Sequence, residues 1–191
     1  MAKGALENFS ADFLTERLRA SGVLPRGRVL AVDAGERRTT IVSTIAPLRV
    51  AYSSDAPAEA PTRLFLKATR GGLDPGLRSV GEREVAFYRY AAPLMPDGAV
   101  PRCYDAEFID GSFHLLLEDL SETHAIITTW PLPPSDEACE CIIDTWASFH
   151  AFWWRHPSLG RGVGTFLDEA ALAKINRRVS RTLYALRRHA R

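Results

Sequence analysis

The stretch LFLKATR (residues 64–70) decides the fold, because it sets a lysine inside a run that otherwise has the character of a buried strand. Side chains alternate between the two faces of a strand, so both leucines and the alanine point one way, while Lys67 shares the other face with Phe65 and Thr69. Two interpretations of Lys67 remain open from this stretch alone. It lies on a solvated face or edge strand, where lysine discourages aggregation, or it binds an anionic group.

Hydrophobic periodicity predicts the elements around this strand. Ser10 is an N-cap for a first helix, and Asp110-Gly111 is a dipeptide favoured in two-residue hairpin turns. The expected elements are helices over about 10–21, 80–94, 135–155 and 167–191, and strands over 28–33, 41–52, 64–70, 102–109 and 112–118, with a short connection at 34–39. We therefore predict an α+β chain: a five-stranded antiparallel sheet with one helix inserted (residues 1–120), followed by a helical region (residues 121–191).

The helix expected over 80–94 carries a carboxylate on its apolar side. At about 100° per residue, one face collects Val80, Glu84, Phe87, Tyr88 and Ala91. A buried carboxylate is costly unless it is paired, and a lysine on a half-buried strand has the same problem. The helix follows the lysine strand and must pack back on the sheet, so we expect Lys67 and Glu84 to meet. A lysine held in this way is a point charge for phosphate oxygens.

Composition excludes several classes of protein. The chain has 191 residues, 46% of them apolar, and a net charge of +1, so no global basic field calls for nucleic acid. No apolar run approaches the roughly 18 residues that cross a bilayer, and residues 1–10 lack the apolar stretch of a signal peptide. We expect a cytoplasmic protein whose partners include neither nucleic acid nor a membrane.

The cysteines predict no disulfide framework and no metal site. Cys103, Cys139 and Cys141 form an odd set, as expected of reduced thiols. On a helix, Cys139 and Cys141 point about 200° apart and cannot share one ion.

The order of these elements resembles the small lobe of protein-kinase-like enzymes, in which a lysine on the third strand pairs with a glutamate on the following helix and holds nucleotide phosphates. It is most similar to the aminoglycoside phosphotransferase, choline kinase and ecdysteroid-kinase-like branch, over about residues 25 to 157. The strings that carry the resemblance are LFLKA (64–68), EVAFY (84–88), LLLEDL (115–120) and WASFHAFWW (146–154).

The resemblance implies an ATP-dependent transfer of phosphate to a small-molecule hydroxyl, with Mg²⁺ as a further cofactor. It implies that Lys67 contacts the phosphates, that Glu84 orients it, and that main-chain groups of Glu118 and Leu120 bind the adenine edge at the interlobe hinge. The side chains of Glu118 and Asp119 are equally well explained as solvated. His150 lies at the position of a packing histidine in this branch, so we expect a structural role for it rather than general-base chemistry.

Two departures from the family pattern qualify these expectations. The phosphate-covering turn has a single glycine, Gly35, so phosphate contacts there are expected from the hydroxyls of Thr39 and Thr40 and nearby N–H groups, with Glu36 opposing them. The His-Gly-Asp catalytic loop and the later metal-binding aspartate are absent from the sequence. We therefore expect an amino-terminal part that is inactive by itself, with the catalytic base beyond Arg191 and no catalytic or metal-binding residue within the chain.

The alternative is a non-enzymatic module, either a pseudokinase-like nucleotide binder or a scaffold.

The final helix adds a further expectation, because one side of it is apolar and the other is basic. Its apolar stripe contains Leu172, Ile175, Val179, Leu183 and Leu186. Left without a covering surface, this stripe is expected to promote self-association, whereas nucleic-acid or membrane binding by the basic side is the less favoured interpretation.

Overall fold

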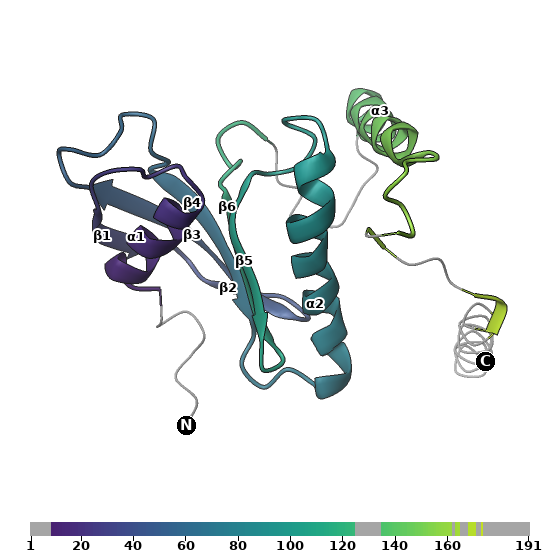
Figure 1. Ribbon diagram of the computed structural model, residues 1–191, viewed down its shortest axis with the longest axis horizontal. Helices are drawn as coiled ribbons and strands as arrows, with labels where there is room; N and C mark the ends of the chain where they lie inside the picture. Colours follow the sequence, from purple (N-terminus) through teal and green to yellow (C-terminus); the bar gives the residue numbers. More distant parts are fainter. Residues whose placement is uncertain (1–8, 125–134, 162, 165–167, 171–172, 174–191) are drawn as a thin grey trace. The chain divides into compact units, whose positions relative to one another are not determined.

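The predicted antiparallel sheet is present in the computed structural model, with six strands instead of five (Figure 1). The structure describes residues 9–124, 135–161, 163–164, 168–170 and 173. The strands are β1 (Val29–Ala34), β2 (Arg38–Thr39), β3 (Ser43–Tyr52), β4 (Arg63–Thr69), β5 (Cys103–Ile109) and β6 (Ser112–Glu118). Their order in the sheet is β1-β3-β4-β6-β5, and β2 pairs with the far end of β3. The strand that carries Lys67 is thus central.

The helices lie where periodicity predicts them, and one of them changes its winding. They are α1 (Ala11–Ala20), α2 (Arg78–Ala86) and α3 (Asp136–Trp153), and α2 is preceded by a 3₁₀ turn, Pro75–Leu77. Beyond Ala86 the same helix continues as a π-helical turn, Phe87–Ala91, and ends in a 3₁₀ turn, Ala92–Leu94. Almost all of the helix predicted over 167–191, including its apolar stripe, lies outside the described residues.

The chain divides into two compact units, Met1–Phe149 and His150–Arg191. The sheet, α1 and α2 belong to the first unit. The lobe boundary expected at residue 120 stays a prediction.

The sixth strand arises because Pro47 interrupts the pairing along β3. A proline has no N–H to donate to a neighbouring strand. The carbonyl of Pro47 still accepts a hydrogen bond from the N–H of Gly35 at 2.9 Å, but the ladder between β1 and β3 ends at Ala34. It resumes at Arg38, which pairs with Ile45. The connection expected at residues 34–39 is therefore a three-residue break followed by a short strand.

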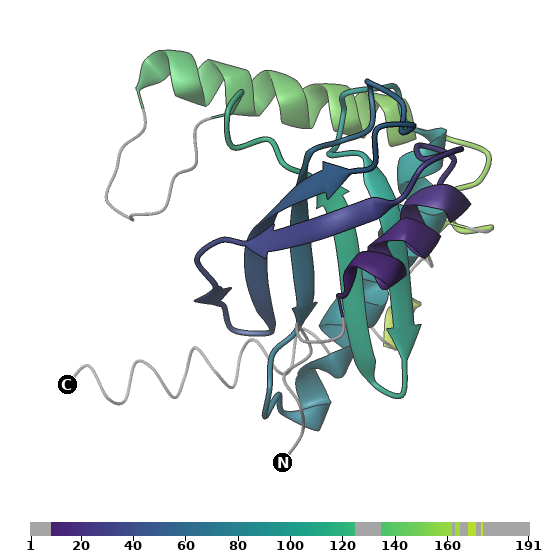
Figure 2. The ribbon, with the colours of Figure 1, turned by 90° about the vertical axis from the view of Figure 1, so that its left-hand side faces the viewer.

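One face of the sheet is covered by α1 (Figures 1 and 2). Leu14 and Leu18 of α1 are fully buried, and Ser10 caps the helix by accepting a hydrogen bond from the N–H of Phe13. The largest hydrophobic core forms here, and its buried members are Leu14, Leu18, Leu24, Val29, Leu48, Val50, Ala60, Leu64, Leu66 and Leu116. Helix α1 contacts both β1 and β5, the two edge strands, because the twisted sheet curls around it.

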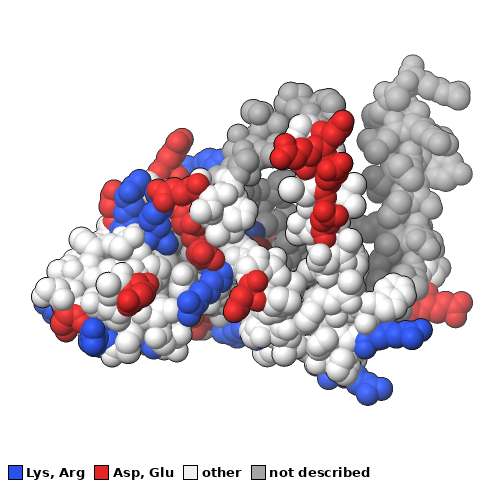
Figure 3. Space-filling view, turned by 90° about the horizontal axis from the view of Figure 1, so that it is seen from above, with Lys and Arg blue, Asp and Glu red and all other residues white. Residues whose placement is uncertain are grey.

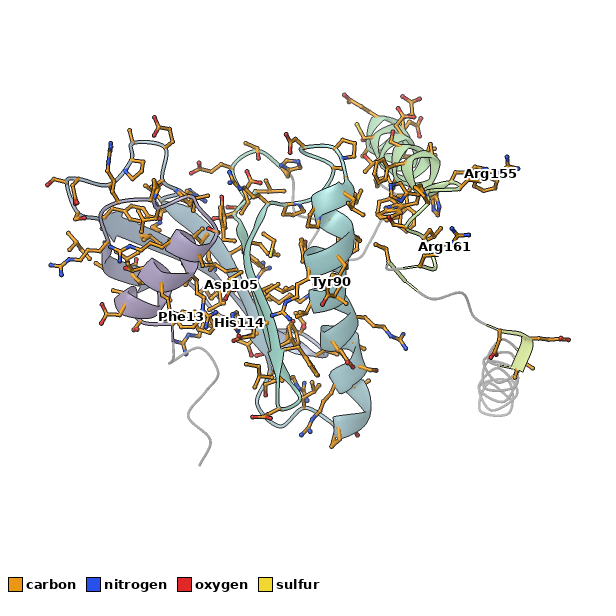
Figure 4. The ribbon with its side chains drawn as sticks, viewed as in Figure 1. Phe13, Tyr90, Asp105, His114, Arg155 and Arg161 are labelled. Carbon is orange, nitrogen blue, oxygen red and sulfur yellow. The ribbon has the colours of Figure 1, made fainter. Side chains whose placement is uncertain are left out.

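A polar cluster supports the same contact at the edge of this core. His114 on β6 lies 2.6 Å from the carboxylate of Asp105 on β5, and Arg17 of α1 approaches the same carboxylate at 3.6 Å. The ring of Phe13 meets His114 edge to face. Figure 4 shows Phe13, Asp105 and His114 gathered between α1 and the β5–β6 pair. His114 and Asp105 thus satisfy each other by a hydrogen bond where the helix meets the sheet, whereas Arg17 contributes its charge at a longer distance, and its Nε atom has no hydrogen-bond partner among the described residues.

The opposite face of the sheet is covered in part by α2. The buried members of this second core are Val85, Ala106, Phe113, Leu115 and Leu117, with Phe65, Tyr88, Cys103 and Phe108 packed against them. Val80 was predicted to belong to the buried stripe of the helix and is 43% exposed, so that part of the prediction is wrong. Gly81 and Val85 are buried instead, because α2 is rotated to bring its glycine against the sheet.

The predicted β5–β6 hairpin is confirmed at its turn. Asp110 and Gly111 have φ angles of 52° and 75°, and Ile109 pairs with Ser112. Two consecutive left-handed residues form the turn that matches the right-handed twist of a strand pair.

Charged side chains of both signs are interspersed over the sheet-bearing part of the face in Figure 3, in keeping with the net charge of +1. Among the described residues, no helix is long and apolar enough to cross a membrane.

We predict that Gly81→Ala destabilises the first unit. Alanine is the better helix former by about 1 kcal/mol, but a Cβ at position 81 would overlap the ring of Phe113. We expect the overlap to dominate, with a net loss of about 1 to 3 kcal/mol. Chemical denaturation measures it, and Glu82→Ala at the neighbouring exposed position is the control. A Gly81→Ala variant at least as stable as the parent would contradict this packing.

Candidate functional site

The ion pair expected between β4 and α2 is present. The Nζ atom of Lys67 lies 2.6 Å from Oε1 of Glu84, and the two side chains are 24% and 26% exposed. An ammonium group has three N–H donors. Among the described residues, Glu84 is the partner that the structure shows for one of them. Lys67 is therefore held in position by Glu84 and is still reachable from solvent.

Strand register places further side chains on the same face as Lys67. Residues directly opposite each other in an antiparallel ladder share a face. Lys67 pairs with Ile45 on one side and with Leu115 on the other, and one step along the strands Phe65 pairs with Pro47 and Leu117. These pairs form two rows that run across the sheet.

Helix α2 covers only one end of these rows. Its backbone packs against β6 and β5, and Leu115 and Leu117 of β6 are buried on this face. Ile45, Pro47 and Phe65, at the other end, are only partly buried. Lys67 lies at the border between the two parts. The result is a partly exposed apolar surface with a positioned cation at its edge, which suits a ligand with a flat apolar part and an anionic part.

The β2 tip places a basic residue on the face of Lys67. Of the two threonines predicted to contact phosphate, one lies on the opposite face and the hydroxyl of the other is hydrogen-bonded within the tip. Thr39 pairs with Thr44, which puts its side chain on the face opposite Lys67. The hydroxyl of Thr40 is engaged with Ser43, at 2.8 Å from its Oγ and as acceptor of its N–H. Arg38, in contrast, pairs with Ile45 and so lies in the same row as Lys67.

Sequence reasoning missed Arg38 because it assigned residues 34–39 to a connection, in which no side chain has a defined face. Had residues 38 and 39 been assigned to a short strand, the alternation of side chains along it would have indicated that Arg38 and Thr39 lie on opposite faces. Two strand spacings separate Arg38 from Lys67, about 10 Å between backbones, a gap that a long arginine side chain and an anion span together.

Gly35 has a packing role in the observed fold. A Cβ at this position would lie 2.9 Å from Cγ of Pro47, so glycine is required for the close approach of the break to β3. Its N–H is already donated to the carbonyl of Pro47. A phosphate contact by Gly35 stays a prediction, and the observed contacts do not favour it.

The hinge segment is the name used for residues 118–124, which begin at the last residue of β6 and to which the resemblance assigns the interlobe hinge. The N–H of Glu118 donates to the carbonyl of Arg102, and the carbonyl of Leu120 accepts from the N–H groups of Thr123 and His124. Two of the four main-chain groups proposed to bind adenine thus have internal partners. The carbonyl of Glu118 and the N–H of Leu120 are the groups to which the prediction now applies.

A buried carboxylate shapes the hinge segment. The side chain of Asp119 is 4% exposed and receives hydrogen bonds from Arg63 at 3.1 Å and from the N–H of Ser121 at 3.0 Å. Burial alone would raise the pKa of Asp119, but the hydrogen bonds from Ser121 and the guanidinium of Arg63 outweigh it and hold the pKa below 3.8, its ordinary value. The sequence-based view of Asp119 as solvated is thus not what the structure shows.

Tyr88 and Cys103, which pack against the core beneath α2, both have raised pKa values. Burial, with a smaller contribution from the charge of Glu84, raises the pKa of Tyr88 to about 12. Burial likewise raises the pKa of the Cys103 thiol to about 12. Both groups stay protonated near neutral pH, so we assign neither a nucleophilic role.

The Mg²⁺ implied by the family resemblance has no ligand set in the part of the chain that the structure describes. No group of three His, Cys, Asp or Glu side chains there is arranged so that it could hold a metal ion.

A separate hollow of about 600 Å³ lies at the end of α3. Its lining is aromatic and basic: His150, Trp153, Trp154, Arg155, His156, Pro157, Leu159 and Arg161. Arg155 and Arg161 are labelled in Figure 4. The hollow belongs to the unit His150–Arg191 and contains none of the residues predicted to bind nucleotide.

We predict that the Lys67–Glu84 pair contributes little to folding stability. Ion pairs this exposed contribute about 0 to 1 kcal/mol, so Glu84→Gln should lower the free energy of unfolding by no more than that. Leu66→Ala, which truncates a fully buried neighbour on β4, should cost about 2 to 5 kcal/mol. Urea denaturation of both variants provides the comparison. A loss for Glu84→Gln as large as that for Leu66→Ala would mean that the pair is structural.

We predict that Asp119 titrates below its ordinary pKa and that Arg63→Gln raises its midpoint. A carboxylate whose pKa is lowered on folding stabilises the fold above its unfolded pKa, and this contribution is lost as the pH falls through the folded pKa. NMR detection of the Asp119 carboxyl carbon measures both midpoints. An ordinary midpoint in the parent chain, or one that Arg63→Gln leaves unchanged, would exclude the proposed pairing.

No protein-family model, no curated protein and no solved structure matches this chain.

Proposed function

We propose that the partly exposed surface beside Lys67 binds a nucleoside triphosphate, and that the chain is the ATP-binding part of a phosphotransferase acting on a small-molecule hydroxyl, akin to the aminoglycoside phosphotransferase, choline kinase and ecdysteroid-kinase-like branch. The observation that carries the proposal is the Lys67–Glu84 pair at 2.6 Å, beside a sheet surface that α2 leaves partly uncovered.

The chemistry of the surface supports a bipartite ligand. Ile45, Pro47 and Phe65 offer an apolar platform for a flat base, and Lys67 and Arg38 lie on the same face as cations for phosphates. The hinge segment follows β6, which is paired directly with the Lys67 strand. Its remaining main-chain groups can read the edge of a base by hydrogen bonds, as they do in protein-kinase-like enzymes.

Glu84 acts on the ligand through Lys67. A lone lysine samples many rotamers. A carboxylate at 2.6 Å restricts the ammonium to one side. Lys67 therefore loses less side-chain entropy when it meets the phosphates than an unpaired lysine would.

A second candidate is nucleotide binding without transfer. It is favoured by one observation: the sequence contains no His-Gly-Asp loop to supply a base for the acceptor hydroxyl. The two candidates share the binding site and differ in whether a catalytic loop accompanies it. Because the chain by itself is expected to be inactive in both cases, the gene sequence beyond the codon for Arg191 decides between them: a His-Gly-Asp string there supports the phosphotransferase, and its absence supports the module.

We predict that Lys67→Met weakens ATP binding by at least about tenfold, equal to about 1.4 kcal/mol, and that Arg38→Met weakens it less. Isothermal titration calorimetry measures both effects. Arg83→Met is the matched control, because it removes the same charge from an exposed position on α2. Equal ATP affinities for the parent chain and Lys67→Met, with both folded by circular dichroism, would rule out the proposed site.

A further inference from the structure

Arg63, at the start of β4, links the Lys67 strand to the hinge segment. Its guanidinium donates to Asp119 at 3.1 Å, to Ser121 Oγ at 2.8 Å and to the carboxylate of Glu122. All three acceptors belong to the hinge segment. One side chain of the sheet thus holds most of a turn that the sheet ladder does not reach.

Strand register puts this link on the face that carries the proposed ligand. Leu64 pairs with Glu118, so the next residues outward, Arg63 and Asp119, are cross-strand neighbours. Both follow the alternation of Lys67 and point to its side of the sheet. Arg63 precedes Lys67 by four residues, about 13 Å along the strand. This distance suits a nucleotide whose phosphates lie at Lys67 and whose base lies near the hinge segment.

Asp119 transmits the effect of Arg63 to the main chain. One carboxylate oxygen accepts from Arg63, and the other accepts the N–H of Ser121, which closes a tight turn around Leu120. The carbonyl of Leu120 is turned inward to Thr123 and His124. Because the N–H of Leu120 and the carbonyl of Glu118 belong to the same short segment, their directions depend on this turn.

The charge balance favours an anchoring role over direct contact with phosphate. Arg63 faces two carboxylates, Asp119 and Glu122, so its charge is already compensated. Lys67 faces one carboxylate and Arg38 is exposed on the same face. An arginine fork is suited to holding several acceptors in a fixed geometry. Phosphate attraction is thus expected at Lys67 and Arg38, and orientation of the hinge segment at Arg63.

We propose that Arg63 is a positioning residue, which sets the affinity of the site for the base of the nucleotide by fixing the hinge segment and has no part in binding the phosphates. This inference rests on the proposed nucleotide site. It adds to that site a separation of tasks along one strand, with base recognition at the start of β4 and phosphate binding four residues later.

The test separates base from phosphates by using three probes on the full chain: ATP, adenosine and inorganic tripolyphosphate. Their dissociation constants are measured by NMR-detected titration, which reaches millimolar affinities. For Arg63→Gln we expect affinities for adenosine and ATP to fall by about five- to tenfold, as for the loss of a charged hydrogen bond, and the affinity for tripolyphosphate to stay the same. Lys67→Met should show the converse, with tripolyphosphate binding lost and adenosine binding retained.

Two further variants guard against a general effect on folding. Arg63→Lys keeps the charge and loses the fork, so it should recover only part of the base affinity. Arg17→Gln is the matched control, since Arg17 also approaches two carboxylates and is 28% exposed, against 26% for Arg63, but lies on the α1 face. It should leave the affinities for all three probes unchanged.

The outcomes distinguish the two proposals. Unchanged adenosine affinity in Arg63→Gln, with Lys67→Met still defective for tripolyphosphate, overturns the role of Arg63 and leaves the nucleotide site standing. An equal loss for adenosine and tripolyphosphate in Arg63→Gln also overturns it, because a positioning residue acts on the base alone. A parent chain that binds none of the three probes overturns both proposals.

Discussion

Lys67 lies on a central strand, and the way in which the fold accommodates this lysine links the packing of the first unit to the candidate site. Strand β4 is buried against α1 on one face, so Lys67 can be accommodated only on the other. Glu84 reaches it because α2 packs on the β5–β6 side of that face and stops short of β3. The same arrangement leaves a strip of sheet uncovered beside the ammonium. Pairing and access to a ligand are thus two results of one placement of the helix.

Local signals in the sequence predicted those parts of the fold that depend on near neighbours. Ser10 as a cap and Asp110-Gly111 as a hairpin turn each act over a few residues, and both are present. The meeting of Lys67 and Glu84 was also predictable, because each has a burial cost that the other offsets. The exposure of Val80 was not predictable from periodicity, since the close fit of Gly81 against Phe113 sets the rotation of α2.

The predicted site was less complete because strand register decides which face a side chain occupies. A single unpaired position moves every later residue to the other face. The break opposite Pro47 is such a position: beyond it, Arg38 lies on the Lys67 face and Thr39 on the other. The burial of Asp119 could not be predicted from local sequence either, because its partner Arg63 lies 56 positions earlier in the chain and is brought to it by strand pairing.

The missing N–H of Pro47 also has an energetic consequence for the β2 tip. Two residue pairs join β2 to β3, and the three-residue break separates them from the longer β1–β3 ladder. Short segments that share few hydrogen bonds with their surroundings open locally at a free energy well below that of global unfolding. Arg38 is therefore carried by a small cooperative unit that can open while β4 stays intact. A ligand that joins Arg38 to Lys67 would couple the two units and suppress hydrogen exchange at the tip.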